Sequence, residues 1–69
     1  MKLSARNVIK GTIKAIETGA VNAEVVVEIA PGLEIAAIIT KKSCKHLGLK
    51  KGKEAYVIVK ASSVMIGTE

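Results

Sequence analysis

Apolar residues occupy every second position over residues 21–29, and this strict alternation constrains the fold more than any other feature of the chain. A period of two places successive side chains on opposite faces, as in a half-buried β-strand. Pro31 and Gly32 follow, and they favour a tight turn because proline presets its φ angle and glycine accepts a positive φ. The alternation resumes over residues 33–39, so the sequence predicts a β-hairpin.

The second face of this hairpin is also partly apolar, at Val26, Ala36 and Ile38. Strands that are apolar on both faces need a second surface to pack against, beyond their own domain core. The chain has 69 residues, and a domain of that size buries only about 60% of its unfolded surface. Because Cys44 is the only cysteine and Cys44 and His46 are the only soft ligands, neither a disulfide within the chain nor a zinc site is expected. We therefore expect one domain over residues 1–69 that is stabilised by self-association.

The rest of the chain adds three strands and one short helix. Alternation predicts strands over residues 8–17, 54–60 and 63–66, and Gly11 within the first indicates a bend or a bulge. Residues 40–47 break the alternation, and they predict a helix capped by Thr40 and ended by Gly48. Five strands with one helix between the third and fourth predict an all-β fold, an OB-like barrel.

The charge balance favours an anionic partner, because 11 Lys and Arg residues against 6 Asp and Glu residues give a net charge of +5. Tyr56 is the only aromatic residue, so the chain lacks the stacking platforms of single-strand nucleic-acid binders. A small, compact anion is favoured, and a basic OB-type nucleic-acid-binding protein remains the alternative. No signal peptide and no membrane span is recognisable, and with a free thiol this predicts a cytoplasmic protein.

Five blocks of the sequence, in order, resemble the molbindin (Mop) family and cover most of the chain. They are SARNVIKG (4–11), GAVNAEV (19–25), ITKKS (39–43), LGLKKG (47–52) and VKASSV (59–64), so they are spread over residues 4–64 and cover most of the chain only when the segments between them are included. The resemblance implies an OB-like barrel that assembles as a homohexamer, a trimer of dimers. It also implies that molybdate or tungstate binds between the subunits, in a storage or buffering role. No catalytic constellation accompanies these blocks, so an enzyme is not expected.

By the same resemblance, Ser4, Arg6, Lys60 and Ser62 are expected to carry an intersubunit oxyanion site. Arg6 has the chemistry for this role, since its guanidinium offers a planar fork of donors with a permanent charge. If the phase of the last strand is shifted by one residue, Ser63 replaces Ser62.

Thr40 and Ser43 lie at the start of the predicted helix, where their hydroxyls either complete the oxyanion site or serve only as helix caps. A second site on a symmetry axis, built from main-chain N–H groups and the Asn22 side chain, has its candidates in Gly19, Ala20, Val21 and Asn22. Cys44 is expected to be a buried thiol and His46 a surface imidazole. The lysines at positions 41, 42, 50, 51 and 53 are expected to form a solvated basic face that steers anions.

Overall fold

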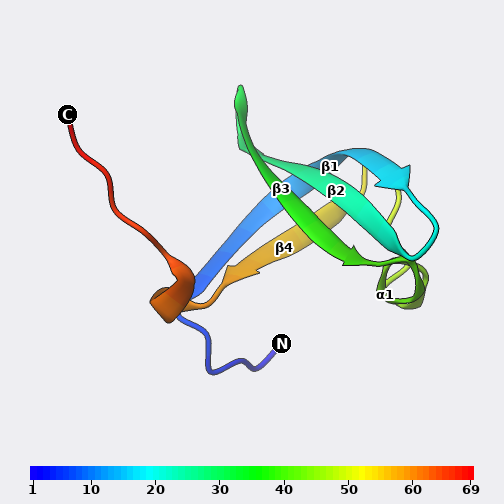
Figure 1. Cartoon of the computed structure of the whole chain (residues 1–69), viewed down its shortest axis with the longest axis horizontal. Helices are drawn as coiled ribbons and strands as arrows, with labels where there is room; N and C mark the ends of the chain where they lie inside the picture. Colours follow the sequence, from blue (N-terminus) through cyan, green and yellow to red (C-terminus); the bar gives the residue numbers. More distant parts are fainter.

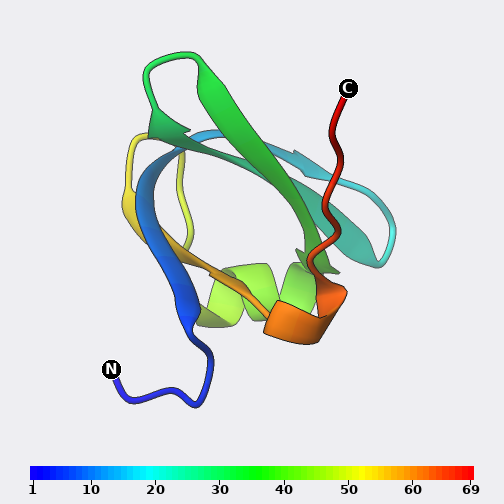
Figure 2. The ribbon, with the colours of Figure 1, turned by 90° about the vertical axis from the view of Figure 1, so that its left-hand side faces the viewer.

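The computed structural model describes all residues from 1 to 69 and contains one antiparallel sheet with the strand order β3-β2-β1-β4. A single short α-helix lies at one end of the sheet, and the sheet is strongly curved (Figures 1 and 2). The elements in chain order are β1 (Asn7–Thr18), β2 (Asn22–Ala30), β3 (Leu33–Thr40), α1 (Lys41–His46), β4 (Glu54–Val59) and the 3-10 turn η1 (Ala61–Ser63).

The predicted hairpin is confirmed as β2 and β3. Ala30 pairs with Leu33 across the Pro31-Gly32 turn, and Gly32 has a φ of 76°, which glycine adopts without strain. The inward face of β2 supplies three of the five buried side chains, and Ile13 of β1 packs with two of them. The five buried residues are Ile13, Ala23, Val25, Val27 and Cys44.

The first strand serves two partners, since its first half pairs with β4 and its second half pairs with β2. Gly11 lies where the change occurs. A Cβ atom there would lie 2.6 Å from the carbonyl oxygen of Glu28, so glycine permits the close approach of β2. The register with β2 shifts between Ile13 and Ala15, which leaves Lys14 as the extra residue of a bulge.

This bulge corrects the predicted face of β1. The alternation placed Ala15 on the same face as Ile13, but Ala15 is exposed and Ile16 packs against the core. The physical reason is that one extra residue in a strand inverts the alternation of all side chains that follow it.

The helix prediction is confirmed in its position and its ends. The Thr40 side chain caps α1, Gly48 adopts a φ of 64° after it, and Cys44 is its buried residue. His46 is exposed, as predicted.

The predicted fifth strand, residues 63–66, is not present, and no pairing joins β3 to β4 to close a five-stranded barrel. Instead, η1 ends in hydrogen bonds from Ser63 N–H to Lys60 O and from Val64 N–H to Ala61 O. These two bonds turn the chain, so the residues that follow do not continue along the sheet edge.

Apolar side chains remain widely exposed in the single chain, including Ile38 of β3 at 63% and Tyr56 of β4 at 53%. Five buried residues form a small core for a domain of this length. None of the helices has the length and apolar character needed to cross a bilayer.

Candidate oxyanion-binding site

Arg6 and Lys60 come together at the end of the β1–β4 ladder. Asn7 pairs with Val59 as the last pair of this ladder, so Arg6 and Lys60 each lie one residue beyond it, at the same end. Both residues are exposed. Strand pairing thus brings residues that are 54 positions apart in the sequence to the same end of one ladder.

Neither of these two cations has a carboxylate partner. The ion pairs of the chain join Lys10 to Glu54 at 3.3 Å and Lys14 to Glu28 at 3.9 Å. Two cations at one end of a ladder without a counterion repel each other, and a dianion between them would remove that repulsion. The pair therefore has the charge that a tetrahedral dianion requires.

Ser4 and Ser62 lie close to this pair in the sequence and are both exposed. Ser4 precedes β1, Ser62 is the middle residue of η1, and Ser63 is its last residue. None of these three hydroxyls makes a hydrogen bond within the chain. They are available as donors to a ligand beside Arg6 and Lys60.

Thr40 and Ser43 are hydrogen-bonded to each other at the start of α1. The Thr40 hydroxyl oxygen accepts a hydrogen bond from Ser43 N–H at 3.0 Å and donates to Ser43 Oγ at 2.8 Å. Both residues are exposed, so the Ser43 hydroxyl can still donate outward. The capping function predicted for Thr40 is confirmed. Because Thr40 donates its only hydroxyl proton to Ser43, the Ser43 hydroxyl is the donor of this pair that remains available.

The β1–β2 loop, which carries the candidates for a second site, lies directly beside this cap. Asn22 pairs with Thr40, and Lys41 N–H donates to Val21 O at 2.8 Å. Gly19 N–H is used within the loop, by Asn22 O at 2.8 Å, whereas Ala20 and Val21 donate their N–H groups to no backbone carbonyl.

The loop and the helix cap are separate candidates in the sequence, and only the pairing of β2 with β3 shows that they adjoin. Counting along both strands from the Ala30–Leu33 pair at the hairpin turn places Asn22 within one residue of its actual partner, Thr40. The exact register additionally depends on the irregularity between Glu28 and Ala30.

A single chain does not unite all the predicted site residues. Figure 1 places η1 and the start of β1 at one end of the molecule and α1 at the other. We call the first the η1 end, with Ser4, Arg6, Lys60 and Ser62, and the second the α1 end, with Thr40, Ser43 and residues 19–22. The two ends are therefore separate within one chain.

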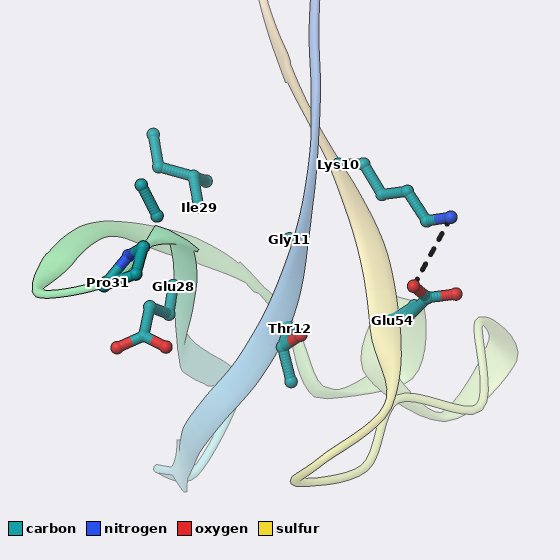
Figure 3. A pocket seen from close by; sticks show the side chains of 8 residues that line it. Lys10, Gly11, Thr12, Glu28, Ile29, Pro31 and Glu54 are labelled. Carbon is teal, nitrogen blue, oxygen red and sulfur yellow. Dashed lines mark ion pairs between the residues drawn. The ribbon is translucent and has the colours of Figure 1, made fainter.

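A hollow of about 370 Å³ lies elsewhere, near the β2–β3 turn, and Figure 3 shows its lining. Lys10 and Glu54 form an ion pair at its rim, and Glu28 also faces it. Two carboxylates disfavour a dianion, and none of the predicted oxyanion ligands lines this hollow. It is therefore not the oxyanion site.

Comparison with known proteins decides the family. Residues 3–66 match the TOBE domain. A probable molybdenum-pterin-binding protein of Haemophilus influenzae is 48% identical over 69 residues, which is all of this chain and all of that protein. The chain belongs to the molbindin (Mop) family. The resemblance that the five sequence blocks indicated is confirmed.

Two solved structures share the molbindin fold seen here. MopII from Clostridium pasteurianum, in an apo form, is 45% identical with a TM-score of 0.91, and the match covers 97% of this chain and 100% of that one. The cytoplasmic molybdate-binding protein ModG, with molybdate bound, is 49% identical with a TM-score of 0.94, over 100% of this chain and 49% of that one. The names of these relatives describe binding and not catalysis.

Proposed function

We propose that this molbindin binds molybdate and tungstate at sites between copies of the chain, as a store or buffer of the oxyanion and not as an enzyme. The proposed assembly is a homohexamer, a trimer of dimers, of single domains spanning residues 1–69. The proposed location is the cytoplasm, which is the location named for ModG. The bound oxyanion is the ligand that the protein holds, and no further cofactor is proposed.

The observation that carries this proposal is the full-length likeness to molybdate-binding relatives, one of which holds molybdate. The chemistry of the η1 end agrees with it. Molybdate is a tetrahedral dianion that only accepts hydrogen bonds, and Arg6 and Lys60 present donors and positive charge without a competing carboxylate.

The separation of the two ends supports an intersubunit location. In the proposed site, Ser4, Arg6, Lys60 and Ser62 of one copy face Thr40 and Ser43 of another. Association of copies would bury exposed apolar side chains such as Ile38 and Tyr56, which favours an oligomer. The unused N–H groups of Ala20 and Val21, with the Asn22 amide, are proposed to form the second class of site where loops of several copies meet.

Calorimetric titration of the purified protein with molybdate, tungstate, sulfate and phosphate tests the proposal. We expect molybdate and tungstate to bind alike, because they have the same shape and charge. Sulfate has shorter bonds, so donors placed for molybdate lie too far from its oxygens, and we expect much weaker binding. Phosphate carries a proton at neutral pH that would meet only donors. Equal affinity for sulfate would contradict the proposed function.

Two companion measurements complete the test. Light scattering at micromolar concentration should report an oligomer, and a particle of about the mass of one chain would contradict the proposed assembly. A nucleic-acid-binding protein would instead bind oligonucleotides with an affinity that falls steeply with salt concentration. The lone aromatic residue, Tyr56, offers no stacking platform for that alternative.

A further inference from the structure

The positive charge of the chain is concentrated in one segment. Residues 41–53, which form α1 and the turn into β4, contain six lysines and no acidic residue. The rest of the chain contains five basic and six acidic residues, so the whole net charge of +5 comes from this segment. All six lysines are exposed except Lys41, which is half-buried. We call them the lysine cluster, namely Lys41, Lys42, Lys45, Lys50, Lys51 and Lys53.

The turn is held against the sheet and against the end of α1. Gly52 N–H donates to Ile13 O at 2.8 Å, and Ile13 N–H donates to Lys53 O at 2.9 Å. The Lys53 ammonium donates to Gly48 O, just after α1, at 3.0 Å. The lysines of the helix and of the turn therefore belong to one ordered unit, and a partner meets them together without first ordering a loop.

No lysine of the cluster has a carboxylate partner within the chain. The ion pairs join Lys10 to Glu54 and Lys14 to Glu28. Glu54 directly follows the cluster in the sequence, but its carboxylate is engaged by Lys10 at 3.3 Å. Uncompensated charge of one sign gives this part of the surface a positive potential, which attracts the anionic groups of a partner.

The chemistry of the segment favours a protein partner over a nucleic acid. Residues 41–53 include neither an arginine, which recognises phosphate with a bidentate fork, nor an aromatic side chain on which a base could stack. Leu47 lies between the lysines of α1 and those of the turn, and 58% of it is exposed. An apolar residue bordered by polar ones is typical of a protein interface. A peptide can cover Leu47 with an apolar side chain, whereas a phosphate backbone cannot.

We propose that the lysine cluster docks an acidic segment of another protein, with Asp and Glu carboxylates on the lysines and an apolar side chain on Leu47. Such contacts give fast association and a strong dependence on salt concentration. Docking is compatible with the proposed oxyanion site, because two residues turn an α-helix by about 200° and Lys45 therefore lies on the opposite side of α1 from Ser43. The inference goes beyond the proposed function and does not rest on it.

Fluorescence anisotropy tests the docking in the absence of oxyanion. The probe is a short labelled peptide of Glu and Asp with one central Leu, titrated with the purified protein at low salt. We expect the peptide to bind, and to bind much more weakly when the salt concentration is raised. Absence of binding, or an affinity that is independent of salt, would overturn the proposal. Because no molybdate is present, this result is distinguishable from a failure of oxyanion binding.

A triple variant removes charge from the cluster itself. Lys45→Gln, Lys50→Gln and Lys51→Gln are combined, and we expect the affinity for the peptide to fall about tenfold, because three exposed ion pairs are lost. Circular dichroism checks that the sheet is retained.

The matched control removes the same amount of charge from the rest of the chain, through Lys2→Gln, Lys10→Gln and Lys14→Gln. Its affinity for the peptide should stay within about twofold of the parent protein, since these lysines lie outside the cluster. Equal losses in the two triple variants would show that the peptide responds only to net charge, and the docking surface would be refuted.

A double-stranded oligonucleotide of the same charge as the peptide serves as the competing ligand. We expect the parent protein to bind it more weakly than the peptide, because the cluster offers no contact for bases and nothing on a phosphate backbone covers Leu47. Equal or tighter binding of the oligonucleotide would overturn the assignment of a protein partner.

Discussion

The two ends of the molecule differ in whether the polar side chains of the proposed site form hydrogen bonds or ion pairs within the chain. At the α1 end, Thr40 and Ser43 are joined to each other by two hydrogen bonds that also cap a helix. At the η1 end, Arg6 and Lys60 lie one residue beyond the last β1–β4 pair, and their side chains make neither a hydrogen bond nor an ion pair.

This difference separates residues whose hydrogen bonds support the fold from residues that are proposed to bind a ligand. A cap contributes to stability whether or not a ligand is present. Arg6 and Lys60 make no ion pair within the chain that their replacement would break, so their substitution should affect the proposed ligand more than the fold. Substitutions at the η1 end should therefore lower the affinity for molybdate, whereas substitutions at the α1 end should lower the stability of the fold.

The largest expected effect is that of Arg6→Ala on affinity. A charge-assisted hydrogen bond contributes roughly 1.5–3 kcal/mol, so molybdate affinity should fall on the order of tenfold to a hundredfold. Arg6→Lys should recover only part of this loss, because the charge remains and the fork is lost. Calorimetry measures the affinity and light scattering shows that the oligomer persists. Unchanged affinity in an intact Arg6→Ala oligomer would show that the site is assigned wrongly.

Lys60→Ala should follow with a loss of about tenfold, because a dianion is then short of one countercharge. Since Arg6 and Lys60 serve one ligand in the proposed site, the double variant should lose less than the sum of the two single losses. Calorimetry on the four proteins of the cycle measures this coupling. Strictly additive losses would mean that the two residues act on different ligands.

Thr40→Ala should lower the stability of the fold more than it lowers the affinity for molybdate, in contrast to the Arg6→Ala and Lys60→Ala variants. Loss of an N-cap costs about 1 kcal/mol, which lowers Tm by roughly 4–8 °C in a domain of this size. Thr40→Ser keeps the capping oxygen and is the matched control. Thermal unfolding at fixed protein concentration measures the shift. If Thr40→Ala weakened molybdate binding as much as Arg6→Ala does, the contrast between the two ends would collapse.

The smallest effect distinguishes Ser62 from Ser63. A neutral hydrogen bond contributes about 0.5–1.5 kcal/mol, so the serine that contacts the ligand should cost roughly two- to tenfold in affinity when replaced by alanine. The other substitution should leave the affinity unchanged. Parallel titrations of the two variants decide between them, and equal affinities for both variants and the parent protein would remove η1 from the site.

Much of this fold could be predicted because its determinants are local. The β2–β3 hairpin follows from alternation and from Pro31-Gly32, and α1 follows from Thr40 and Gly48. The site residues came from chemistry and from the family resemblance. No alternation pattern could place Arg6 at the same end of a ladder as Lys60, since that depends on which strands pair.

Two errors have a common cause, because both concern backbone geometry that side-chain patterns do not encode. The bulge at Lys14 moved Ala15 out of the core and Ile16 into contact with it. The turn at η1 removed residues 63–66 from the sheet, although their composition is suited to a strand. A strand needs a neighbouring edge in reach, and sequence alone gives no information on where that edge lies.

The sequence by itself determined the alternating strands, the turn, the helix cap, the basic charge and the family, because each depends on residues close together or on residue type. Tertiary structure alone decided the strand order, the placing of Arg6 and Lys60 at one end of a ladder, the placing of Thr40 beside Asn22, and the separation of the two ends. These depend on long-range pairing, in which the free energy of burying Ile13 against Val25 and Val27 sets how the strands align.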